Sequence, residues 1–285
     1  MKSFQMKALA LATLGLGGLV MAGSAFAACP TITQPAVSGS PGGGGAWSSQ
    51  FITGTIPAYM DIDSTGGLNG TSCSLKVSLS SSSNGAALVR DSSPNDEQRI
   101  RVRFYVDFNA LITGGFAVSN QSVTLHRMND TTAPFSSDQL VVKVTGGATP
   151  TVRFVVSDIN PGSHVTQVAI PLPTSANNQY RIEYDMQLGS GSTTSVPGLP
   201  ALPAGCTAMP AAGNACIRMW VTAAGSASLD TAPDASITFN GTGYSGAKTS
   251  NLGLQSGSPQ YRANHAGTVI RFDEYDSRRQ TFIGQ

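Results

Sequence analysis

The chain has 285 residues, of which 40% are hydrophobic and 12% charged, and its formal net charge is +1 at pH 7. No basic block is present that could neutralise a phosphate backbone, so the composition argues against a nucleic-acid partner. The length is enough for one large domain or two small ones. We expect one, because no linker rich in Pro, Gly and Ser separates two complete sets of strands.

The first 27 residues have the features of a bacterial secretory signal peptide. Lys2 and Lys7 precede an apolar run over residues 8–20, and the small-residue pattern AFA follows at residues 25–27. Because the run is short and a cleavage pattern follows it, we predict cleavage after Ala27 and not retention as a membrane anchor. Without Lys2 and Lys7, 15 basic residues face 16 acidic ones. The mature chain is expected to be soluble and secreted or periplasmic.

Four cysteines remain in the mature chain: Cys29, Cys73, Cys206 and Cys216. An even number in an exported protein predicts two disulfides. Among the three possible pairings we expect Cys206 with Cys216, closing a short loop, and Cys29 with Cys73, tying the mature N-terminus to a strand. Chain entropy gives these bonds about 3 and 4 kcal/mol. Zinc is the alternative for the near pair, but no histidine lies beside it.

A lipid-anchored outer-membrane form is the alternative for Cys29. Residues 26–29 read FAAC, which loosely resembles a lipobox. Phe26 is a poor substitute for the usual leucine, and lipidation would leave an odd number of thiols. We therefore expect the disulfide.

Residues 28–45 form a Gly/Pro-rich segment that predicts no regular structure, and residues 46–285 are expected to form a single β-sandwich domain. Short β-rich runs separated by turn residues, with no convincing amphipathic helix, indicate an all-β class. Many strands with one buried face each imply two packed sheets.

Three strands show clear alternation of apolar and polar residues. Ile100, Val102 and Phe104 alternate with arginines over residues 99–108. Residues 180–188 and 216–222 alternate in the same way. Further strands are expected at residues 74–79, 122–127, 139–144, 152–156, 165–170, 236–239 and 268–272.

Several blocks resemble one family, the secreted bacterial laminin-G-like or concanavalin A-like jelly-roll proteins. They read LVRDSSPNDEQRIRVRFYVDFNALI from residue 88, YRIEYDMQ from 180, IRMWVTAAGS from 217 and RFDEYDSRRQTFIG from 271. The resemblance covers about a quarter of the mature chain and implies a two-sheet antiparallel jelly-roll sandwich. Two departures fall on loops: VTAAG where the family reads Val-Asp-Gly after the tryptophan, and a Pro-rich insertion carrying two cysteines. The family's ligand therefore does not transfer to this chain.

One strand resembles the Glu-x-Asp-x-Glu strand of jelly-roll glucanases. Here Glu183 and Asp185 are followed by Gln187. An amide cannot donate and retrieve a proton as a carboxylic acid does, so this route to glycoside hydrolysis is broken. We predict no catalytic residue and a protein that is not an enzyme, with a glycoside hydrolase or lyase as the alternative.

Metal binding is weakly indicated at one place only. Asp61 and Asp63 stand two residues apart before a glycine turn, a spacing that can contribute oxygen ligands to a structural calcium ion. No other cofactor is expected.

Aromatic and charged side chains share the polar faces of the clearest strands. Rings among Arg, Glu and Asp suit sugar recognition, because the ring covers C–H surface while the charged groups bond hydroxyls. The alternative is that these rings pack beneath a loop. The candidate ligand-binding residues, on an expected concave face, are Arg101, Arg103, Tyr105, Glu183, Asp185, Arg218 and Trp220.

The expected function is therefore a secreted, lectin-like binding module for a glycan or another cell-surface component. A purely structural envelope or adhesion subunit is a further alternative. The charge-dense C-terminal stretch is predicted to be a strand, with Asp273 and Asp276 forming an ion-pair network with Arg101 and Arg103.

Overall fold

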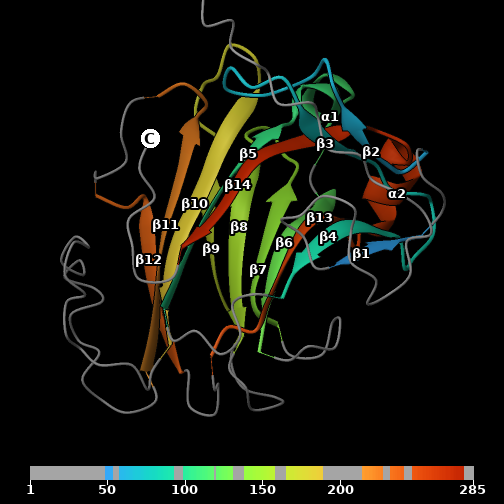
Figure 1. Ribbon diagram of the computed structural model, residues 1–285. Coiled ribbons are helices and arrows are strands. Elements are labelled where there is room, and N and C mark those ends of the chain that lie inside the picture. The colour runs from blue at the N-terminus through green and yellow to red at the C-terminus, as the bar shows by residue number, and fades with distance from the viewer. Residues whose placement is uncertain are drawn as a thin grey trace, which may run out of the picture.

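The computed structural model describes residues 49–53, 58–92, 99–118, 120–130, 138–157, 165–188, 214–226, 232–240 and 246–278. These residues build two antiparallel sheets of seven strands each, packed face to face (Figure 1). The expected all-β sandwich class is therefore confirmed.

Each sheet combines strands that are distant in sequence. Sheet 1 has the order β1 (Ser49–Ile52), β4 (Ala86–Asp91), β13 (Thr249–Gln255), β6 (Ser122–Asn129), β7 (Asp138–Thr145), β8 (Thr151–Ser157) and β9 (Val165–Pro171). Sheet 2 has the order β12 (Ala235–Asn240), β11 (Asn214–Ala223), β10 (Gln179–Gln187), β5 (Arg99–Asp107), β14 (Ile270–Arg278), β3 (Ser74–Val77) and β2 (Met60–Asp63). The chain crosses repeatedly from one sheet to the other, as in a jelly roll.

The core lies between the sheets and follows from alternation along the strands. In β5 the side chains of Ile100, Val102 and Phe104 are fully buried, and Val142 of β7 and Phe154 of β8 face them from sheet 1. The intervening residues of β5 therefore point to the other side of sheet 2, away from this core.

All ten strands expected from the sequence are present, with ends shifted by a few residues. Four others, β1, β2, β4 and β13, were not expected. Two short helices also occur, α1 (Asn109–Thr113) and α2 (Pro259–His265), where the sequence predicts none. The class is unaffected, because they have only five and seven residues.

A β-bulge interrupts the pairing of β14 with β5. Asp273 lies opposite Tyr105, whereas Asp276 lies opposite Arg103, so three steps along β14 match two along β5. Glu274 within the bulge has φ 45°, a left-handed conformation that is uncommon outside glycine. The extra residue keeps both aspartates in register with polar-face residues of β5.

Two of the four cysteines lie in the described residues. Cys73 and Cys216 are both disulfide-bonded. Cys73 adjoins β3 and Cys216 lies in β11, and β10, β5 and β14 stand between those strands. Four strand spacings amount to about 19 Å, too far for these two sulfurs to bond each other. This excludes one of the three pairings. Cys29, Cys206 and the segments 1–27 and 28–45 lie outside the described residues, so the expected pairing stays a prediction.

Candidate functional site

The expected binding residues come together on the side of sheet 2 that faces away from the core. Strands β5, β10 and β11 are neighbours, and their register sets Glu183 between Arg103 and Trp220, and Asp185 between Arg101 and Arg218. Two further arginines, which the sequence analysis did not select, occupy the same side. We call this set the arginine face: Arg99, Arg101, Arg103, Tyr105, Arg181, Glu183, Asp185, Arg218 and Trp220.

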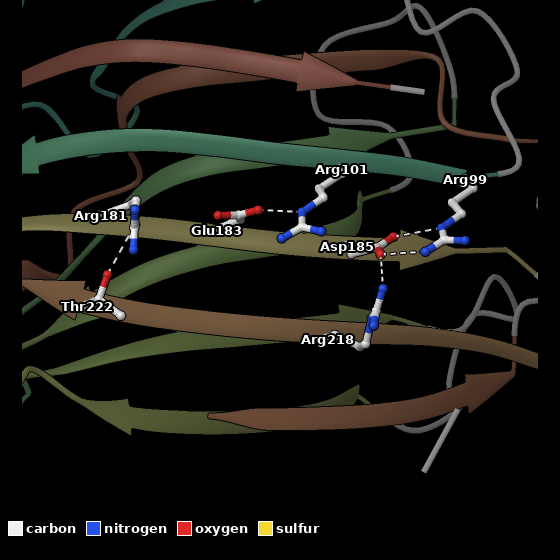
Figure 2. Close-up of polar contacts among 7 residues, drawn as sticks. All are labelled: Arg99, Arg101, Arg181, Glu183, Asp185, Arg218 and Thr222. Carbon is white, nitrogen blue, oxygen red and sulfur yellow. Dashed lines mark hydrogen bonds and ion pairs between the residues drawn. The ribbon is translucent and has the colours of Figure 1, made fainter. Parts of the chain in front are cut away.

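Asp185 joins two arginines of the arginine face. Its carboxylate accepts two hydrogen bonds from Arg99, Nε to Oδ1 at 3.1 Å and Nη2 to Oδ2 at 2.7 Å, and another from Nη2 of Arg218 (Figure 2). Burial alone would raise the pKa of Asp185, but the bonds and charges of the two arginines outweigh it and hold the pKa below its ordinary value. Asp185 is therefore held as an anion.

At Glu183, burial and the neighbouring arginines affect the pKa in different proportions than at Asp185. Its Oε1 accepts from Nε of Arg101, while its Oε2 is buried and has no hydrogen-bond partner among the described residues. Burial raises the pKa of Glu183, and Arg101 and the neighbouring arginines offset only part of this rise. Two carboxylates on one strand thus have opposite pKa shifts, because one binds two arginines directly and the other binds one.

Guanidinium groups lie against both aromatic rings of the face. The guanidinium carbon of Arg101 lies 4.9 Å from the ring centre of Trp220, and that of Arg218 lies 5.6 Å from it. The Arg103 guanidinium lies 5.9 Å from the ring of Tyr105. These separations are within range for cation–π attraction, so the rings help to hold the arginines in place.

The arginine face is buried, which the sequence did not indicate. None of the seven candidate ligand-binding residues is more than 9% exposed, and Glu183 is fully buried. Strict alternation predicted a polar side, but alternation indicates only that the two sides of a strand differ and not that either is open to solvent. The ion pairs here are therefore of the buried kind, which are costly to break.

Positive charge predominates on this side of the three strands. Five arginines face three carboxylates, counting Asp107 at the end of β5. Arg99 and Arg181 have the same strand parity as the selected residues, so the periodicity was sufficient to find them. Arg181 donates from Nε to Oγ1 of Thr222 at 3.2 Å. The outer side of β5, β10 and β11 is therefore buried and carries more arginines than carboxylates.

The predicted pair between Asp273 and Arg101 is wrong. Asp273 accepts hydrogen bonds from the backbone of Leu68 at 2.8 Å, from Oγ1 of Thr71 and from its own neighbour Glu274 at 2.7 Å. The bulge places Asp273 opposite Tyr105, four residues along β5 from Arg101. Arg101 instead binds Glu183.

Asp276, the other predicted member of that network, lies opposite Arg103 on the neighbouring strand. An ion pair between Asp276 and Arg103 stays a prediction. The C-terminal charged stretch is thus a strand of sheet 2 through Arg278.

The weak calcium candidates are already engaged by the protein itself. Asp63 accepts from the backbone N and Oγ1 of Thr65, each at 2.9 Å, and forms an ion pair with Arg271 at 3.0 Å. Asp61 accepts from the backbone of Ile62. Within the described ranges no group of three or more His, Cys, Asp or Glu side chains is arranged to hold a metal ion.

No protein-family model matches the chain, and no curated protein matches it. Among solved structures it is similar to an alginate lyase from Klebsiella pneumoniae, with TM-score 0.41 and 8% identity over 78% of this chain and 84% of that one. An exolytic PL7 alginate lyase from Zobellia galactanivorans gives 0.46 and 9% over 82% and 91%. The binding domain of botulinum neurotoxin serotype G gives 0.41 and 9% over 82% of this chain but 44% of that one. Similarities this low assign no activity.

Proposed function

We propose that this protein is a non-catalytic binding module for an acidic glycan, with the arginine face as its site. The observation that carries the proposal is the excess of guanidinium groups there. In addition, two buried polar atoms, Nε of Arg218 and Oε2 of Glu183, have no hydrogen-bond partner within the part of the chain that the structure describes. Buried polar atoms are normally bonded. A carboxylate or sulfate would pair with the guanidinium donor, and a sugar hydroxyl with the carboxylate oxygen.

Burial shapes how such binding would proceed. Trp220 is 3% exposed and Arg218 is 4% exposed, so a glycan reaches them only when this face is uncovered. Association that requires a conformational change is slow compared with docking onto an open surface. We therefore expect a low association rate constant for glycan binding.

A jelly-roll hydrolase or lyase is the second candidate, and Glu183 is the reason. A buried carboxyl with a raised pKa and one oxygen without a partner has the properties of a general acid or base. Against it stand Asp185, held ionised by two arginines, and Gln187, which carries no transferable proton. A structural envelope or adhesion subunit would need neither a raised pKa at Glu183 nor a carboxylate oxygen left without a partner.

A glycan array of uronate-bearing, sulfated and neutral saccharides, followed by reducing-end assays on every bound glycan, separates these functions. We expect acidic glycans to bind without cleavage, and Arg218→Gln to weaken binding. Arg262→Gln is the matched control, because Arg262 lies in α2 and its guanidinium bonds, among the described residues, only the backbone oxygen of Gly257. Unchanged binding by Arg218→Gln would contradict the proposal. Cleavage that disappears in Glu183→Gln would establish the enzyme instead.

We also propose that the protein acts outside the cytoplasm. The signal-like N-terminus and the even cysteine count support this. No helix within the described ranges is long and apolar enough to cross a membrane. Mass spectrometry of unreduced peptides should link Cys206 to Cys216 and Cys29 to Cys73. A lipid on Cys29 would instead place the protein at a membrane surface.

A further inference from the structure

A second basic site lies on the opposite sheet. Strands β6, β7, β8 and β9 are neighbours in sheet 1 (Figure 1), and a groove of about 380 Å³ runs across their outer side. Its lining residues are Asn120, Ser122, Lys143, Thr145, Gly146, Arg153, Val155 and Gln167. A volume of this size is in the range of small-ligand sites.

Two cations face each other in this groove. The register of β7 and β8 pairs Lys143 directly with Arg153. Directly opposed side chains lie about 5 Å apart at Cβ, and like charges there are destabilising. Lys143 forms no hydrogen bond or ion pair with the described residues, and Nε of Arg153 is buried without a partner. Among the described residues, neither cation forms an ion pair with a carboxylate.

The surrounding strands supply little counter-charge to Lys143 and Arg153. The described residues of β6 to β9 contain a single carboxylate, Asp138. Its Oδ2 accepts from Arg127 at 2.5 Å and its Oδ1 from Asn129 at 2.8 Å. Burial lowers the pKa of Lys143, and repulsion from Arg127 and Arg153 lowers it further, against the attraction of Asp138. Lys143 is thus partly desolvated and poorly compensated.

We propose that this groove binds the anionic group of an acidic sugar, with Lys143 and Arg153 as its two charged donors. Bound between them, one carboxylate or sulfate removes the like-charge repulsion and satisfies the vacant Arg153 donor. The hydroxyl and amide side chains of Ser122, Thr145 and Gln167 then meet the hydroxyls of the ring. This site is independent of the arginine face, because the two lie on the outer sides of different sheets.

The test is calorimetric titration of the mature protein in the Arg218→Gln background, which weakens the arginine face. Glucuronate, glucose, sulfate and phosphate are the probes. We expect glucuronate to bind and glucose not to bind. Arg153→Gln and Lys143→Gln should each lower the glucuronate affinity by about tenfold or more. Lys76→Gln, which removes a positive charge from β3 of sheet 2, should leave it unchanged.

Three outcomes would overturn the proposal. Glucuronate could fail to bind, or Lys76→Gln could weaken it as much as Arg153→Gln does, which would show diffuse attraction only. Phosphate and sulfate could bind as tightly as glucuronate, which would refute the acidic-sugar assignment. Thermal unfolding without ligand checks that the variants fold. Arg153→Gln should be at least as stable as the parent protein, because it removes one of the two charges that repel each other. If it is not, Lys143→Gln alone decides the result.

Discussion

Asp185→Asn offers a direct measure of how strongly the arginine face holds sheet 2 together. The substitution keeps the shape of the side chain but removes the negative charge between Arg99 and Arg218. Removing one partner of a buried ion pair costs about 3–5 kcal/mol, because the remaining charges stay buried without compensation. For a domain of this size that corresponds to a fall in Tm of about 6–20 °C.

Urea unfolding at equilibrium, with the disulfides kept intact, gives the free energy directly. Asp61→Asn is the control, since Asp61 is only half-buried and forms no ion pair with any described residue. A loss below about 1 kcal/mol in Asp185→Asn would match an exposed surface pair and refute the inference that this face is buried.

The pH dependence of the unfolding free energy, measured for the parent protein and for Asp185→Asn, gives a second check. The pKa of Asp185 is lowered in the folded state, so its contribution to stability is present above the ordinary pKa and is lost as pH falls through the folded value. The difference in unfolding free energy between the parent and Asp185→Asn should therefore narrow in acid. A difference that is constant down to low pH would show that charge is not the cause.

Three further outcomes are expected. Asp273→Asn and Arg101→Gln should have additive effects on the unfolding free energy, within about 0.5 kcal/mol, because the two residues bind different partners; a larger coupling in a double-mutant cycle would contradict the register of β14. Burial holds the pKa of His126 at about 3, so between that value and about 6.5 the unfolded chain binds one more proton and stability falls by up to about 1.4 kcal/mol per pH unit of acidification. His126→Gln should flatten that slope in urea titrations at several pH values. Calcium should not raise the Tm, because Arg271 already neutralises Asp63; a calcium-dependent rise that Asp63→Asn abolishes would restore the metal site.

Alternation along single strands was enough to predict the central part of sheet 2. β5, β10 and β11 each have one apolar side, so parity alone assigned Glu183 and Asp185 to the polar side. Parity does not reveal what covers that side, so the burial of the arginine face had no signal in these strands.

Two of the four missed strands lack alternation because they are buried on both sides. β4 is buried at all six positions and β13 at all seven, so neither shows a solvent-facing side. In β13, Thr249, Ser250 and Asn251 have low apolar character, yet they are buried because their side chains or neighbours form hydrogen bonds within sheet 1. A pattern search that expects polar residues outside cannot recognise such a strand.

The bulge in β14 determines the meaning of the last charged stretch. In an uninterrupted strand, residues an odd number of positions apart point to opposite sides, so Asp273 and Asp276 could not share one. The extra residue at Glu274 shifts the alternation by one position, so Asp273 and Asp276 point to the same side of sheet 2. If every residue were kept but the bulge were closed into regular pairing, the facing of everything after it would be reversed, with Asp276 toward the apolar layer and Ser277 outward. The orientation of the final strand thus depends on the backbone leaving Glu274 unpaired, and a deletion of Glu274 would leave Asp276 opposite Arg103.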